Sequence, residues 1–150
     1  MIGKGEGILF EEMDISSLRS IVRLAKNSPE EYNFFFNPKE GLLEIFDKSK
    51  LDKYYMIISD GALSGYFSLR GLDDGYRIPR FGIYILYEHK EKGLGKFALK
   101  EAIRLSKELN YSGLDLKVNP KNKIAINLYC SLGFAKNGSK GEEDIYFLEL

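Results

Sequence analysis

The chain has 150 residues, of which 44% are hydrophobic, enough to bury roughly two-thirds of the unfolded surface in one domain and too few for a second. Its 22 basic and 22 acidic residues cancel, so we expect neither nucleic acid nor a membrane as a partner. A single cysteine, no apolar run long enough to span a bilayer and no apolar core of a signal peptide near the start lead us to expect a reducing, cytoplasmic setting.

The first part of the chain predicts a strand followed by two helices. Residues 8–12 form a short β-prone run, and Asp14 then occupies the N-cap position of a helix whose apolar residues recur at helical spacing. Asn37, followed by Pro38 and, three residues after the cap, by Glu40, has the pattern of a second helix start. We therefore expect the second helix to begin at Pro38.

A hairpin and a buried strand are predicted next. The β-prone runs 53–59 and 62–70 are separated by Asp60-Gly61, which is a strong signal for a tight turn between two antiparallel strands. A polar loop follows at residues 71–77. Residues 81–86 are apolar on both sides, as in the central strand of a sheet.

Helices and strands alternate in the second half of the chain. Residues 93–109 carry an apolar stripe at helical spacing, residues 114–118 are β-prone, and residues 124–132 predict a helix that Gly133 ends. The segment from Phe134 onward predicts a closing hairpin. A strand-helix-strand crossover makes its two strands parallel, so we expect an α/β (α+β) fold with a mixed, mostly antiparallel sheet and one parallel pair.

A glycine-containing loop opens the helix at residues 93–109. Gly93 and Gly95 let backbone N–H groups approach a ligand closely, and the first turn of a helix adds unpaired donors and the positive end of the helix dipole. Lys90, Lys92 and Lys96 surround this loop in a chain without net charge. The loop predicts an anion-binding site, although two glycines are also consistent with a plain tight turn.

Two nucleotide-binding motifs fit this loop poorly. A Walker A loop requires a glycine where Lys90 stands and a serine or threonine where Phe97 stands. The dinucleotide-binding pattern Gly-x-Gly-x-x-Ala matches at residues 93–98, and Asp115 follows at a suitable separation. However, polar residues separate this loop from the preceding strand, and Asp115 lies within a strand. We therefore discount both motifs.

Lys90-x-x-Gly93-x-Gly95 after an apolar strand resembles the Gln/Arg-x-x-Gly-x-Gly/Ala signature of the GNAT superfamily of acyl-CoA-dependent N-acetyltransferases. Lysine in place of Gln or Arg keeps a charge and loses the planar fork, so we expect a looser grip on the pyrophosphate. The order of elements resembles that fold over nearly the whole chain. The resemblance implies one GNAT-like domain at residues 1–150, with about seven strands flanked by four helices, and acetyl-CoA as the cofactor.

Residues 118–134 resemble a second GNAT motif. In it a strand ends in Asn, another Asn and an Ala follow at spacings of three, and Leu-Tyr precedes a Gly-Phe helix exit. In that family the helix runs beside the pantetheine arm of the cofactor, the second Asn contacts the arm, and the Tyr approaches the thioester sulfur. The matching residues here are Asn122 and Tyr129. Together the two motifs imply a set of cofactor-binding residues, namely Ile83, Ile85, Lys90, Glu91, Lys92, Gly93, Leu94, Gly95, Lys96, Asn119, Asn122, Ala125 and Tyr129.

The resemblance also implies catalytic roles. Attack of an amine on a thioester places negative charge first on the carbonyl oxygen and then on the sulfur. We expect backbone N–H groups near Ile83 and Ile85, above all that of Ile85, to stabilise the oxygen, provided that their strand splays from its neighbour as in the resembling proteins. Tyr129 can protonate the thiolate, because a phenol of pKa about 10 stays protonated at neutral pH. A purely structural core tyrosine is the alternative.

The general base is not evident from the sequence. Many GNAT members have a glutamate on the strand before the glycine loop, whereas residues 80–86 contain no carboxylate. We expect the ammonium proton to leave through ordered water, helped by Asp73, Asp74 or Tyr84.

In the resembling fold, two segments wall the acceptor site, here residues 32–36 and 69–78. The candidate acceptor-binding residues are Phe34, Phe35, Arg70, Asp73, Asp74 and Tyr84. Residues 70–79 resemble GNAT members of bacterial surface-sugar pathways. An amino-sugar nucleotide is therefore our first candidate acceptor, a polyamine or antibiotic amine the second, and a protein N-terminus or lysine the third. We expect direct attack in a ternary complex, by a monomer or a homodimer.

Other readings of the sequence are weaker or belong to another class. His89 is the only histidine and cannot form a metal site alone, and Cys130 has no predicted base to activate it, so we expect neither a metal nor a thiol nucleophile. A domain that binds acyl-CoA and regulates without transferring the acyl group is the alternative from another class. The missing strand glutamate fits that alternative, whereas Tyr129 argues against it.

Overall fold

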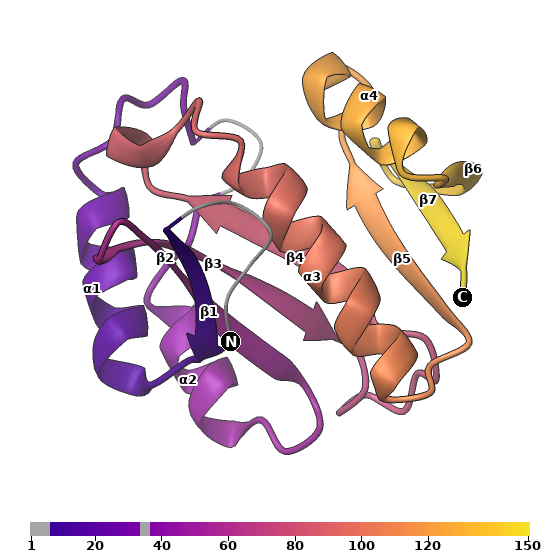
Figure 1. Cartoon of the computed structure of the whole chain (residues 1–150), viewed down its shortest axis with the longest axis horizontal. Helices are drawn as coiled ribbons and strands as arrows, with labels where there is room; N and C mark the ends of the chain where they lie inside the picture. The colour runs from indigo at the N-terminus through magenta and orange to yellow at the C-terminus, as the bar shows by residue number, and fades with distance from the viewer. Residues whose placement is uncertain (1–6, 34–36) are drawn as a thin grey trace.

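The computed structural model describes residues 7–33 and 37–150, which form a seven-stranded sheet with helices on both faces (Figure 1). The strands are β1 (Ile8–Glu12), β2 (Lys53–Ser59), β3 (Ala62–Arg70), β4 (Arg80–Ile85), β5 (Gly113–Val118), β6 (Ala135–Lys140) and β7 (Glu143–Glu149). The helices are α1 (Ile15–Ala25), α2 (Gly41–Lys48), α3 (Leu94–Glu108) and α4 (Lys123–Ser131), with a short 3₁₀ helix η1 (Tyr87–His89).

The strand order across the sheet is β1-β2-β3-β4-β5-β7-β6. The pair β4–β5 is parallel, and the other pairs formed by the described residues are antiparallel. The helix α3 connects the two parallel strands and crosses the middle of the sheet (Figure 1). The mixed, mostly antiparallel sheet expected from the sequence is thus confirmed.

The two faces of the sheet carry separate hydrophobic clusters. Successive side chains of a strand point to opposite faces, so Tyr66 packs with the cluster of α1 and α2, whereas Phe67 packs with α3. Tyr129 of α4 packs against the same cluster as α3. One face is therefore covered by α1 and α2 and the other by α3 and α4.

Two local sequence signals produce the predicted structures. The Asp14 carboxylate accepts a hydrogen bond from the N–H of Ser17 at 2.7 Å and caps α1. Asp60 and Gly61 both have positive φ, 50° and 80°, as a two-residue hairpin turn between β2 and β3 requires. Both structures could be predicted from the sequence because each depends on residues that lie within a few positions of one another.

The predicted start of the second helix is wrong. The helix α2 begins at Gly41, and Glu40 at its N-cap makes no side-chain capping bond. The Glu40 carboxylate pairs with the Lys26 ammonium at 2.9 Å, so it does not reach back toward Asn37. Pro38 is buried, which makes it a packing residue in the approach to α2 rather than its first helical residue.

The carboxylate of Asp73 joins the loop after β3 to the loop before β2. It accepts hydrogen bonds from the backbone N–H groups of Lys50, Leu51 and Asp52, at 2.8 to 3.2 Å. The N–H of Asp73 in turn donates to the Asp52 carboxylate at 3.0 Å. Hydrogen bonds from backbone N–H groups lower the pKa of Asp73, and the one from Asp52 has the largest effect. Asp73 therefore has a structural role as a link between two loops.

We predict that Asp73→Asn lowers the melting temperature at pH 7, because one amide oxygen cannot replace a carboxylate that accepts several N–H bonds. A lowered folded-state pKa contributes stability that is present above the unfolded pKa and is lost as pH falls through the folded pKa. The difference from wild type should therefore shrink below about pH 4. Thermal unfolding followed by circular dichroism at both pH values tests this. Asp74→Asn is the matched control, and an equal loss in both variants would contradict the prediction.

Candidate active site

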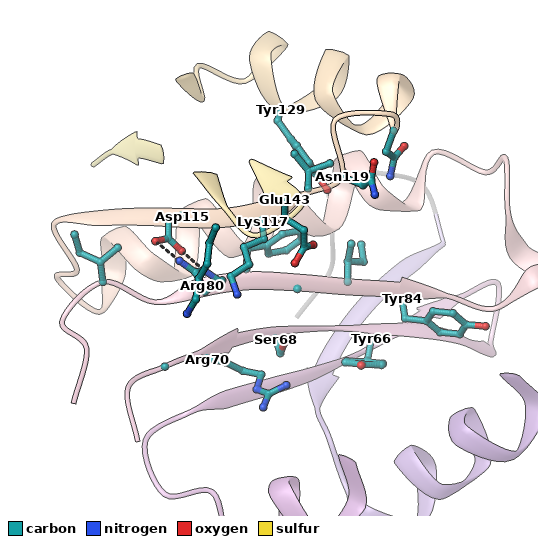
Figure 2. A pocket seen from close by; sticks show the side chains of 18 of the residues that line it. Tyr66, Ser68, Arg70, Arg80, Tyr84, Asp115, Lys117, Asn119, Tyr129 and Glu143 are labelled. Atoms are coloured by element: carbon teal, nitrogen blue, oxygen red, sulfur yellow. Dashed lines mark hydrogen bonds and ion pairs between the residues drawn. The ribbon is translucent and has the colours of Figure 1, made fainter. Parts of the chain in front are cut away.

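The parallel strands β4 and β5 separate soon after they meet. They pair at two positions, Arg80 with Asp115 and Phe81 with Leu116. Pairing of β4 with β3 continues as far as Ile85, on the other side. At the closed end of the opening, the Arg80 guanidinium donates two hydrogen bonds to the Asp115 carboxylate, at 2.8 and 3.1 Å (Figure 2). The splay that a GNAT-like site requires is present.

The backbone of β4 turns alternate N–H groups toward this opening. The carbonyl of Pro79 accepts a hydrogen bond from the N–H of Asp115 at 3.1 Å, so the backbone groups of Pro79 face β5. Backbone groups of alternate residues in a strand point to the same side, which places the N–H groups of Ile83 and Ile85 at the opening. The carbonyl of Ile85 accepts a hydrogen bond from the Tyr32 hydroxyl at 2.6 Å. The backbone N–H groups of Ile83 and Ile85 are thus available to a ligand.

A cavity of about 830 Å³ occupies the opening, a size that suits a small-molecule site. Its lining comes from both faces of the sheet (Figure 2). Tyr66, Arg70 and Tyr84 line it on the face of α1 and α2, and Asn122 and Tyr129 line it on the face of α3 and α4. The cavity therefore runs through the sheet, and molecules bound on opposite faces can meet between β4 and β5.

The helix α4 positions Tyr129 at this cavity. Asn122 is its N-cap, and the Asn122 side-chain oxygen accepts the N–H of Ala125 at 3.4 Å. The Asn119 side-chain oxygen accepts the N–H of Lys121 at 2.9 Å and shapes the turn after β5. Burial raises the pKa of Tyr129 to about 12. The phenol is therefore protonated at neutral pH and is a hydrogen-bond donor to the cavity.

The glycine loop lies at the start of α3, outside the lining of the cavity. Gly93 is the N-cap of α3 with φ 73°, a left-handed conformation that suits glycine, and no side chain caps the helix there. A Cβ atom at Gly95 would lie 4.0 Å from a side-chain carbon of Leu128, so the first turn of α3 is next to α4. The ammonium of Lys90 lies 4.7 Å from the centre of the Tyr87 ring. The Lys92 ammonium lies 3.0 Å from Nδ1 of His89.

The loop between α1 and α2 is bound to β4. The Tyr84 hydroxyl donates to the Asn33 side-chain oxygen at 2.8 Å, and the Asn33 amide donates to the carbonyl of Ala25 at 3.0 Å. The Tyr32 ring makes edge-to-face contacts with Tyr84 and Tyr87. Tyr84, proposed from the sequence as an aid to proton removal, instead has a raised pKa, chiefly because it is buried. Its hydroxyl therefore stays protonated at neutral pH and cannot accept the proton of the amine.

The structure brings together many of the residues expected from the sequence. The cavity is lined by Ile83, Ile85, Asn119, Asn122, Tyr129, Arg70, Asp74 and Tyr84. Asp73 does not line it, because its carboxylate is held by the backbone N–H groups described above. Ala125 packs against the hydrophobic cluster of α3. Phe34 and Phe35 lie outside the described residues.

Several charged residues of the cavity were not found from the sequence. They are Arg80, Asp115, Lys117, Lys140 and Glu143. All but Lys140, whose strand β6 is exposed throughout, lie on strands that pack alternate residues in the core, and β5, β6 and β7 become neighbours only through the sheet order. The pattern of alternation indicates that these residues share a face, but no local motif indicates that the face is beside Tyr129.

The model of the GNAT acetyltransferase family matches residues 18–134. The spermidine N(1)-acetyltransferase of Escherichia coli K12 is 29% identical over 133 residues, which cover 84% of this chain and 72% of that protein. Similar solved structures include a domain from Methanocaldococcus jannaschii DSM 2661, with a TM-score of 0.80, 19% identity and 99% of each chain covered.

A second solved structure at a TM-score of 0.80 is RimL, a ribosomal L7/L12 α-N-protein acetyltransferase in complex with coenzyme A, with 11% identity and coverage of 97% of this chain and 96% of that one. At such identities the structural likeness concerns the fold alone, whereas the family model spans most of the chain and contains both sequence motifs. The chain therefore belongs to the GNAT acetyltransferase family, as an N-acetyltransferase whose acyl donor is acetyl-CoA.

Proposed function

We propose that this enzyme acetylates the primary amine of a small molecule that also carries negative charge, with an amino-sugar nucleotide as the first candidate. The acetyl group passes directly from acetyl-CoA to the amine while both are bound. The charge of the cavity carries the proposal. Its lining has four cationic residues, Arg70, Arg80, Lys117 and Lys140, and three anionic residues, Asp74, Asp115 and Glu143.

The charge balance favours an acceptor with an anionic group. Arg80 and Asp115 bind each other, which leaves Arg70 and two lysines against two carboxylates. A polyamine carries several positive charges and is best matched by an excess of carboxylates. Arg70 lies at the end of β3 and lines the cavity on the face of α1 and α2 (Figure 2). A guanidinium suits a phosphate, which it can bind through two parallel hydrogen bonds.

The donor is proposed to bind on the face of α3 and α4. The uncapped first turn of α3 at Gly93, Leu94 and Gly95 offers backbone N–H groups to the diphosphate. The side chains around this turn that complete the phosphate site are Lys90, Glu91, Lys92 and Lys96. Because α3 begins next to α4, an arm that starts there passes along α4 toward the cavity. Asn119, Asn122 and Ala125 line that path in the proposal.

The reaction is proposed to take place where the cavity crosses the sheet. Acetyl-CoA supplies a thioester carbonyl, and the N–H groups of Ile83 and Ile85 face the place where negative charge develops on its oxygen. Tyr129 lies on the donor face and gives its proton to the departing sulfur. A raised pKa makes full proton transfer less favourable, so the hydrogen bond of the phenol to the developing thiolate is the larger part of its contribution.

A polyamine is the second candidate acceptor, because the Escherichia coli relative described above is a spermidine N(1)-acetyltransferase. The two candidates make opposite demands on Arg70. An anionic acceptor gains a partner in its guanidinium, whereas a polycation is repelled by it.

We predict that Tyr129→Phe lowers kcat by about 100-fold, the ordinary loss for a missing general acid, while coenzyme A binding is unchanged. Thiol release and calorimetry measure the two quantities. Tyr111→Phe is the matched control, since Tyr111 also has a raised pKa and does not line the cavity. Because the pKa of Tyr129 is about 12, its hydroxyl does not ionise below pH about 10. The pH profile of kcat should therefore have the same shape in wild type and in Tyr129→Phe over that range. An unchanged kcat in Tyr129→Phe would contradict the role of its hydroxyl.

We predict that Arg70→Gln raises KM for an amino-sugar nucleotide by about 10- to 100-fold, as expected for a charge-assisted hydrogen bond, and does not raise KM for spermidine. Steady-state kinetics with both acceptors measure this. Arg77→Gln is the control, because Arg77 is exposed in the loop that follows β3 and does not line the cavity. Turnover of spermidine alone, with a lower KM in Arg70→Gln, would establish the polyamine instead.

A further inference from the structure

We propose that Glu143 is the catalytic residue that accepts the proton of the attacking amine. The inference rests on the proposed function, since it concerns the same cavity. It supplies the general base that the sequence of β4 lacks.

The cavity contains three carboxylates among its described lining residues, Asp74, Asp115 and Glu143. Both oxygens of Asp115 accept hydrogen bonds from Arg80, which makes Asp115 a partner of that guanidinium. Asp74 is exposed on the loop between β3 and β4, at the Arg80 end of the opening. From that end to Ile85, β4 rises by about 15 Å, so Asp74 is too far from the N–H groups that face the thioester carbonyl to accept the proton of the amine. Of these three carboxylates, Glu143 is the one left close enough to that place.

The register of the sheet places Glu143 level with the reaction site. Asp144 of β7 is opposite Val118 of β5, so Glu143 is level with Asn119, just beyond the last residue of β5. Phe81 of β4 is level with Leu116 of β5. Three residues further along each of these parallel strands, Tyr84 is level with Asn119, and Tyr84 lies between Ile83 and Ile85. Glu143 therefore lies at the same height along the sheet as the two N–H groups that face the opening.

Glu143 also lies on the acceptor face. Val118 is buried with the cluster of α3, and directly opposed residues of an antiparallel pair share a face, so Asp144 points toward α3. Its neighbour Glu143 consequently points to the opposite face, that of α1 and α2. Figure 2 shows the Glu143 carboxylate directed into the gap between β5 and β4, with Tyr129 beyond it. The proton acceptor and the proton donor are thus on opposite sides of the transferred group, as the reaction requires.

The carboxylate is available for this role. Within residues 7–33 and 37–150, the Glu143 side chain makes no hydrogen bond or ion pair, whereas the next residue, Asp144, binds Ser139 and Lys136. The charged and titratable groups that share the cavity with Glu143 are Lys117, Lys140, Arg70, Arg80, Asp74, Asp115 and the tyrosines Tyr32, Tyr66, Tyr76, Tyr84 and Tyr129. Lys140 is its cross-strand partner and Lys117 its diagonal neighbour on the same face.

The proton balance is complete with these two residues. The amine is bound as the ammonium, and Glu143 takes one of its protons, which frees the lone pair that forms the bond to the carbonyl carbon. The nitrogen of the resulting tetrahedral intermediate then loses its second proton to water. As the carbon–sulfur bond breaks, the sulfur takes a proton from Tyr129. Glu143 then loses its proton to water and Tyr129 regains one from water, so both residues return to their starting state. The net products are the amide, the free thiol and one proton released to water.

The test compares Glu143→Gln with Glu142→Gln, which makes the same change on the adjacent, exposed turn residue. Amine-dependent thiol release is followed from pH 6 to 10, with calorimetry of coenzyme A binding and thermal unfolding as checks of integrity. We expect Glu143→Gln to lower kcat/KM for the amine by about 100-fold at pH 7, with a smaller loss as pH approaches the amine pKa of about 10. Glu142→Gln should stay within about twofold of wild type, and Glu143→Asp should recover part of the activity.

The outcomes separate this proposal from the proposed function. A wild-type enzyme without turnover of any amine overturns both. A wild type that turns over an amine, with a Glu143→Gln profile equal to it at every pH, overturns the base assignment alone. A loss in Glu143→Gln that lies in KM only and is the same at every pH also overturns it, because that is the signature of charge recognition.

Discussion

The early end of pairing between β4 and β5 is the constraint on which the rest of the site depends. In a continuous parallel ladder, the backbone groups of Ile83 and Ile85 would form hydrogen bonds with β5. Because the strands separate after Phe81 and Leu116, these groups have no partner on β5. Such groups are costly to leave unpaired inside a protein. Tyr32 reduces that cost, because its hydroxyl binds the carbonyl of Ile85 and leaves the N–H of the same residue for a ligand. Through Tyr32, the loop between α1 and α2 therefore supports β4 at the opening.

The ends of this opening are held by different means. Arg80 and Asp115 are partly exposed, so their ion pair contributes about 1 kcal/mol or less to stability. Its larger effect is on register, since it joins the first paired residues of the two strands. A slip of one residue would turn the N–H groups of Gly82 and Tyr84 toward the opening and those of Ile83 and Ile85 away from it. At the wide end, the turn of Asn119 and the cap of Asn122 set the direction of α4.

Sequence reasoning succeeded where an interaction is local. The turn at Asp60-Gly61, the cap of Asp14 and the stripe of α3 each depend on residues a few positions apart, and the two GNAT motifs do as well. The predicted start of α2 was wrong, because the carboxylate of Glu40 forms an ion pair with Lys26, a residue distant in the sequence. Sequence reasoning also proposed Asp73 for the acceptor, because no pattern in the sequence reveals that the loop at residues 50–52 presents its N–H groups to that side chain.

This difference follows from how the two halves of the site are built. The proposed donor side consists of helix starts and turns, whose backbone geometry requires particular residues such as Gly93 and Asn122. The proposed acceptor side consists of strand side chains at alternate positions on β3, β5, β6 and β7, and these can change without moving the backbone. The donor side is therefore recognisable from sequence and constrained, whereas the acceptor side is free to vary. For that reason the charges of Arg70, Lys117 and Glu143 indicate the acceptor better than family membership does.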